Sequence, residues 1–141
     1  MRLPAFLPVT AALVAGATFA LTGCTSLPSA CSAVGWSNSL TVELEGDTSG
    51  VSQVQLCTED GCAPARDIDP SGPLGQISVA RQAGGTWSFS TGMTNLDALT
   101  VRTIAADGAV ISETEVTPEW VRVGGSEQCG GPGKATVRVE I

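Results

Sequence analysis

The chain has 141 residues, of which 7 are basic, 14 are acidic and none is histidine, so its formal net charge is −7. An acidic chain whose few bases are scattered singly repels the phosphate backbone, so nucleic acid is not expected as a partner. Without histidine, catalysis by a Ser-His-Asp triad or a Cys-His pair is excluded in its usual form. No cofactor is expected.

The first 23 residues have the pattern of a secretory leader. An apolar run from Leu3 to Ala20 follows the basic residue Arg2, contains no acidic side chain and ends on small residues before a cysteine. The closing stretch Leu21-Thr22-Gly23-Cys24 reads as a bacterial lipobox. This resemblance to bacterial lipoproteins implies cleavage of residues 1–23 as a signal peptide. It also implies a diacylglyceryl thioether and further acyl chains, such as palmitate, on Cys24.

A transmembrane helix is the alternative for the same run, since about 20 apolar residues span a bilayer. Pro4 and Pro8 interrupt it, and Thr-Ser-Leu-Pro-Ser follows Cys24 where basic stop-transfer residues would stand. We therefore expect a protein held by lipid at the extracytoplasmic face of the cell membrane. Residues 24–30 form the lipidated terminus and a linker, and the six residues after Cys24 reach roughly 20 Å at most.

The remaining four cysteines form an even set in an exported, oxidising setting, which predicts two disulfides. Four cysteines allow three pairings. The short Cys57-Thr-Glu-Asp-Gly-Cys62 spacing favours a bridge across a tight hairpin, which leaves Cys31 for Cys129. A metal or thiol redox site is the alternative. The absence of histidine and the four-residue spacing disfavour it.

From Leu40 onward apolar and polar residues alternate with a period of two, as in half-buried strands. The pattern covers residues 40–45, 53–56, 77–79, 87–89, 99–102 and 135–141. Residues 101–104 and 110–113 are expected to form a hairpin, and a further strand-like piece lies at 116–123. Turn signals such as Asp107-Gly108 separate these segments, and no long helical period occurs. We expect residues 31–141 to form one all-β domain, an antiparallel sandwich of seven or eight strands of immunoglobulin-like or fibronectin-like kind. A small β-barrel is the alternative.

The segment 63–75 lacks this alternation and contains three prolines, so we expect a surface loop there, either a connector or a binding surface. Within it, Asp67 and Asp69 are two residues apart ahead of a glycine, as at the start of a calcium loop. The twelfth position of such a loop, Ser78, is not the bidentate glutamate that an EF-hand needs. We expect no metal site here, and Asp67 and Asp69 remain weak candidates.

Two glutamates are the alternative candidates for chemistry. Glu113 and Glu115 are two residues apart on one predicted strand, so both project from the same face. Paired carboxylates can perform acid/base work on a glycoside. Alternating charges are also what the solvent face of a soluble strand displays, and we expect a protein that is not an enzyme.

Three of the six aromatic residues are tryptophans. Trp87 is in phase with Phe89 and is expected in the core, as in many sandwiches. Trp36 precedes the first strand and Trp120 lies in a charged stretch, so these two are candidate contacts if they are not buried.

Several features together resemble uncharacterised small lipoproteins of actinobacteria. They are the lipobox, the short linker, the Cys57–Cys62 hairpin, the Asp107-Gly108 hairpin ahead of Trp120, and Cys129-Gly130-Gly131-Pro132 before the final strand. The resemblance implies location and no mechanism. We therefore expect a noncatalytic binding or structural module at the cell envelope, bound to membrane lipid through acylated Cys24, with envelope polysaccharide or protein as partner. An exported carboxylate-dependent hydrolase or calcium-binding domain is the alternative.

Overall fold

The computed structural model describes residues 30–65 and 69–141 of the chain. The chain divides into two compact units, Met1–Ala30 and Cys31–Ile141, and the second holds every strand described below. The expected signal peptide, Cys24 and nearly all of the expected linker lie outside the described residues. Within the described ranges, no helix is long and apolar enough to cross a bilayer.

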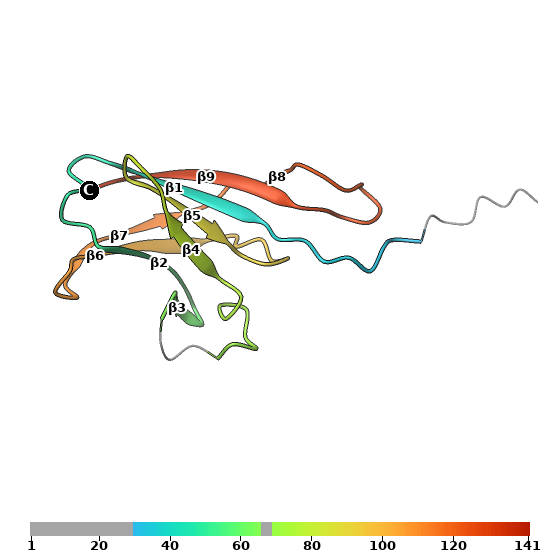
Figure 1. The fold of residues 1–141 in the computed structure, drawn as a ribbon, viewed down its shortest axis with the longest axis horizontal. Helices are drawn as coiled ribbons and strands as arrows, with labels where there is room; N and C mark the ends of the chain where they lie inside the picture. The colour runs from blue at the N-terminus through green and yellow to red at the C-terminus, as the bar shows by residue number, and fades with distance from the viewer. Residues whose placement is uncertain (1–29, 66–68) are drawn as a thin grey trace, which may run out of the picture. The chain divides into compact units, whose positions relative to one another are not determined.

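Cys31–Ile141 contains two packed β-sheets, and no helix occurs in its described part (Figure 1). The first sheet has the spatial order β4 (Ser78–Arg81), β5 (Thr86–Ser90), β1 (Ser39–Glu45), β9 (Gly133–Glu140), β8 (Val121–Arg122). The second has the order β3 (Gly61–Ala63), β2 (Gln53–Thr58), β6 (Leu99–Ile104), β7 (Val110–Val116). Both sheets are open, so the prediction of an all-β sandwich is confirmed and the barrel alternative is wrong.

The core forms because the alternating side chains of both sheets point toward each other. In β1 and β9, every second residue is buried against the opposite sheet, and the residues between are half-buried or exposed. Trp87, 5% exposed, and Phe89, fully buried, lie on the inner face of β5, which confirms the core assignment of Trp87. The largest fully buried side chains are Phe89, Leu40, Leu56, Val42, Val54, Val101 and Val139.

Seven of the nine described strands follow the order of an immunoglobulin sandwich, with one difference in direction, and β3 and β8 add one edge strand to each sheet. The order β9-β1-β5-β4 corresponds to strands A-B-E-D, and β2-β6-β7 corresponds to C-F-G. Every described ladder is antiparallel except β1–β9, in which the last strand of the chain takes the place of strand A and runs parallel to β1. Figure 1 shows β1, in cyan, beside β9, in red. The alternation along β9 identified a strand but carried no information about its direction.

Three details differ from the sequence prediction. The sandwich has nine strands in its described part, one more than expected, because the three-residue β3 is too short for a period to show. The strand expected at 116–123 shortens to Val121–Arg122. The segment 63–75 is more than a surface loop, since Ala63 ends β3 fully buried and Leu74, 5% exposed, packs into the core.

Both predicted disulfides are present. Cys57 and Cys62 face each other directly across the β2–β3 hairpin. Cys31 and Cys129 join the segment before β1 to the segment before β9, across a sequence separation of 98 residues. The first bridge fixes a local turn, and the second constrains nearly the whole sandwich.

The two bridges should contribute unequally to stability. A closed loop of 98 residues removes far more unfolded-state entropy than one of 5 residues, about 4.7 against about 2 kcal/mol in the chain-entropy relation. We expect Cys31→Ser/Cys129→Ser to lower the free energy of unfolding by more than Cys57→Ser/Cys62→Ser, as measured by urea denaturation. Equal losses in the two double variants would contradict this reasoning.

Candidate functional site

Segments from three parts of the sequence meet at one end of the first sheet. The start of β1, at Ser39, lies opposite the end of β5, at Ser90, and beside the start of β9, at Lys134. β8 in turn pairs with the start of β9. The residues that precede β1 and β9, those that follow β5, and those of β8 therefore surround the same end of the sheet.

These segments line a hollow of about 240 Å³, which we call the tryptophan hollow. Trp36 and Trp120, the two tryptophans singled out as candidate contacts, are both half-buried and both line it. Its remaining lining residues are Asn38, Met93, Asn95, Arg122, Gly130, Gly131 and Gly133. The tertiary structure thus brings together two candidates that lie 84 positions apart in the sequence.

Asn38, which is only 3% exposed, ties these segments together. Its backbone N–H donates to the Gly92 carbonyl at 2.7 Å, and its carbonyl accepts from the Thr91 N–H at 3.0 Å. Its side-chain Oδ1 accepts from the Gly133 N–H at 2.8 Å, while Nδ2 donates to Asn95 Oδ1 at 2.7 Å. One asparagine therefore fixes the positions of the strands β1, β5 and β9 at the hollow. An asparagine ahead of a strand carries no sequence signal for this role.

The glycines of the hollow allow the backbone to approach the two indole rings. A Cβ on Gly130 would lie 3.0 Å from Cη2 of Trp36, and a Cβ on Gly133 would lie 3.4 Å from Cε3 of Trp120. The Trp120 indole also packs against the core, and its Nε1–H donates to the Leu96 carbonyl at 3.0 Å. These contacts fix the Trp120 ring, and the Trp36 ring lies against the Gly130 backbone.

Arg122 brings a positive charge to the hollow. Its Nη1 donates to the Ser126 carbonyl at 2.9 Å, within the connection between β8 and β9. That connection is held by the Ser126 N–H donating to Gly130, by Ser126 Oγ accepting from the Cys129 N–H, and by the disulfide to Cys31. The ion pairs of the described residues join Arg102 to Glu113 and Arg138 to Glu43 and Glu45, so none includes Arg122.

The calcium candidates do not assemble a site among the described residues. Asp69 Oδ1 accepts hydrogen bonds from the Ser71 hydroxyl at 2.6 Å and the Ser71 N–H at 2.8 Å. These two bonds, the hydroxyl first, hold the pKa of the Asp69 carboxyl below its ordinary value. Asp67 lies outside the described residues, and the described residues contain no group of three or more Cys, Asp or Glu side chains placed to hold a metal ion.

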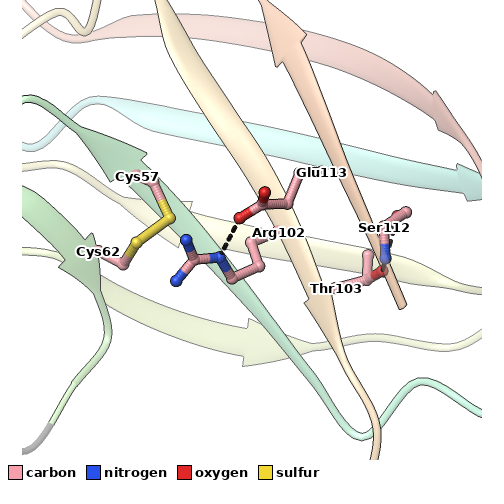
Figure 2. A network of polar contacts seen from close by, with 6 residues as sticks. All are labelled: Cys57, Cys62, Arg102, Thr103, Ser112 and Glu113. Atoms are coloured by element: carbon pink, nitrogen blue, oxygen red, sulfur yellow. Dashed lines mark hydrogen bonds and ion pairs between the residues drawn. A yellow bond between two sulfur atoms is a disulfide. The ribbon is translucent and has the colours of Figure 1, made fainter. Parts of the chain in front are cut away.

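The glutamate candidates lie on the outer face of the second sheet. Arg102 Nε donates to Glu113 Oε1 at 2.6 Å, and Figure 2 shows this pair extending across neighbouring strands β6 and β7. Glu115 lies opposite Thr100, two pairs further along the ladder. The cation across the ladder already neutralises Glu113, so this carboxylate is occupied as a structural ion pair.

A larger hollow, of about 570 Å³, lies in the second sheet where β2 and β7 end and β6 begins. Its polar lining consists of threonine hydroxyls and two carboxylates, those of Glu59 and Glu115, and it has no aromatic or cationic side chain. By volume alone, this hollow would be the candidate site. The tryptophan hollow combines aromatic walls with a few polar groups, which is the composition of ligand-binding sites, and we therefore take it as the candidate site.

Comparison with known proteins finds no matching family, no similar curated protein and no similar solved structure.

Replacing Asn38 tests whether it holds the site together. Asn38→Ala leaves the buried Gly133 N–H without its acceptor, and we expect the free energy of unfolding to fall by about 1–3 kcal/mol in urea denaturation. Asn95→Ala is the matched control, because Asn95 is exposed and water can replace its contact to Asn38. A loss for Asn38→Ala no larger than that of the control would contradict this role.

Proposed function

We propose that the protein is a lipid-anchored lipoprotein that acts as a noncatalytic binding module at the outer face of the cytoplasmic membrane. The observation that carries the binding role is the tryptophan hollow, in which two half-buried indoles, Met93 and Arg122 share one concave surface. Tryptophan and arginine are the side chains that contribute most often to recognition. Envelope polysaccharide is the partner that fits this composition best.

The anchoring part of the proposal rests on the sequence. Residues 1–23 have the pattern of a signal peptide, and Cys24 stands directly after Leu21-Thr22-Gly23. Several acyl chains on one terminus bind a membrane durably, because each buried methylene contributes about 0.8 kcal/mol. The two disulfides agree with an exported domain, since such bonds persist in oxidising compartments. The proposed affiliation is with the small lipoproteins of actinobacteria.

Hydrolysis by carboxylates and calcium binding have less support. Glu113 is paired with Arg102, and Asp69 is engaged by Ser71. Neither carboxylate lines the tryptophan hollow. A binding role uses the side chains that the fold gathers in one place, and we therefore prefer it.

The anchor is tested by the intact mass of the protein purified from its native membrane. We expect a chain that begins at Cys24, carries the added mass of its acyl chains, and shows four thiols only after reduction. Cys24→Ala should abolish the lipid mass and release the protein from the membrane fraction. A full-length mass without lipid would overturn the proposed anchoring.

The binding role is tested by sedimentation with insoluble cell-wall polysaccharide. We expect Trp36→Ala to reduce the bound fraction at least about tenfold, because it removes one aromatic wall of the hollow. Ile111→Ala is the matched control, since Ile111 is a partly exposed apolar residue of the second sheet. Equal binding by both variants and the wild type would exclude the tryptophan hollow as the binding surface.

A further inference from the structure

We infer that the tryptophan hollow binds a sugar ring that carries a carboxylate group, such as a hexuronic acid unit of an acidic polysaccharide. This inference rests on the proposed binding role and adds the chemical class of the ligand. It follows from the size of the hollow, its walls, the kind of hydrogen-bonding groups that it offers, and its charge.

The size of the hollow limits the ligand to a small group. Sites for drug-sized ligands occupy about 300–1,000 Å³. The tryptophan hollow, at about 240 Å³, lies below this range. It suits a single ring at the end of a chain or projecting from it, and it is too small for a folded peptide segment.

The walls suit a ring with one apolar face. The negative face of an indole attracts positively polarised C–H bonds, and a pyranose presents such bonds on its faces. Trp36 lies against Gly130, and Trp120 lies against Gly133 and is fixed by its bond to Leu96. Met93, 54% exposed, adds a polarisable sulfur-containing side chain that adapts to the outline of the ligand.

The side chains of Asn95 and Arg122 retain hydrogen-bond donors for a ligand. Both side-chain groups of Asn38 are used, because Oδ1 accepts from Gly133 and Nδ2 donates to Asn95. Asn95 Oδ1 accepts that same bond, and the amide N–H₂ group of this exposed residue makes no hydrogen bond among the described residues. Arg122 Nη1 donates to the Ser126 carbonyl, and the other N–H donors of the guanidinium remain available. A ligand that carries acceptor atoms matches these side-chain donors.

The charge of the hollow makes a carboxylate the best acceptor. Four arginines are described: Arg102 and Arg138 pair with glutamates, and Arg81 lies 5.3 Å from the centroid of the Trp87 ring. The remaining one, Arg122, has no carboxylate within ion-pair distance among the described residues, although the chain carries a net charge of −7. A guanidinium binds a carboxylate through parallel, charge-assisted hydrogen bonds. A uronic acid supplies both that carboxylate and the ring for the indoles.

The test uses protein labelled with ¹⁵N-tryptophan and purified in detergent, with titration followed by the indole N–H signals. Three probes separate the contributions: sodium D-glucuronate has ring and charge, D-glucose has the ring alone, and sodium acetate has the charge alone. We expect glucuronate to shift the signals of Trp36 and Trp120, with glucose at least about tenfold weaker and acetate giving no saturable shift. The signal of Trp87, which is buried in the core, should stay fixed and serves as an internal reference.

Variants of two arginines supply the matched controls. Arg122→Gln should reduce the affinity for glucuronate at least about tenfold, to the level of glucose, and leave glucose binding unchanged. Arg138→Gln removes an equal charge from the outer face of β9 and should leave both affinities within about twofold. An unchanged Trp87 signal reports that each variant is folded. If Arg122→Gln fails to fold, Arg122→Lys keeps the charge but loses the planar fork and should weaken glucuronate binding selectively.

Each result of the titration supports or overturns one part of the inference about the ligand. Equal binding of glucose and glucuronate would overturn the acidic class and leave the binding role standing. Acetate binding as tightly as glucuronate would overturn the inference that the ligand contains a sugar ring. No shift with any probe would overturn the inference, and retention of cell-wall polysaccharide in the sedimentation assay would then show whether the proposed binding role survives it.

Discussion

The parallel pairing of β1 with β9 is the constraint on which the rest of the sandwich depends. Seven residue pairs join Ser39–Glu45 to Lys134–Glu140, so the first strand of the domain lies beside the last. On the inner face the pairing buries apolar side chains of both strands, among them Val42 and Val137. On the outer face Arg138 Nε donates to Glu43 Oε2 at 3.0 Å. The inner contacts supply most of the stabilisation, because exposed ion pairs contribute about 0–1 kcal/mol.

The candidate site is a consequence of that pairing. Parallel strands begin at the same end of a sheet, so the segments leading into β1 and β9 have to run side by side. The Cys31–Cys129 disulfide joins these two segments, and Asn38 bonds to Gly133 at the point where they enter the sheet. A C-terminal strand antiparallel to β1 would begin at the opposite end and would leave Trp36 and the Gly130–Gly133 backbone far apart. The direction of one strand therefore decides whether the hollow exists.

Most of the described arginines of this acidic chain have partners within the fold. Arg102 and Arg138 are each opposite a glutamate in a ladder, where a cation offsets repulsion between neighbouring carboxylates. On the second sheet, Figure 2 also shows Thr103 contacting Ser112, where the buried hydroxyl accepts the Ser112 N–H at 3.1 Å beside an irregularity of the β6–β7 ladder. These polar contacts join side chains of neighbouring strands within the sheets. Arg122, which is exposed, has no such partner among the described residues, and the proposed acidic ligand is argued from this difference.

The sequence by itself determined the all-β class, most strand positions, the inward side of the alternating strands and the pairing of the cysteines. These features depend on local period and on chain spacing, which are visible without tertiary contacts. It also identified Trp36 and Trp120 as candidate contacts. Only the tertiary structure decided the direction of β9, the shared position of those two indoles, the role of Asn38 and the lack of an ion-pair partner for Arg122 among the described residues. The physical reason is that these properties arise between residues that are up to 95 positions apart, and no pattern within one segment encodes which distant segment will lie beside it.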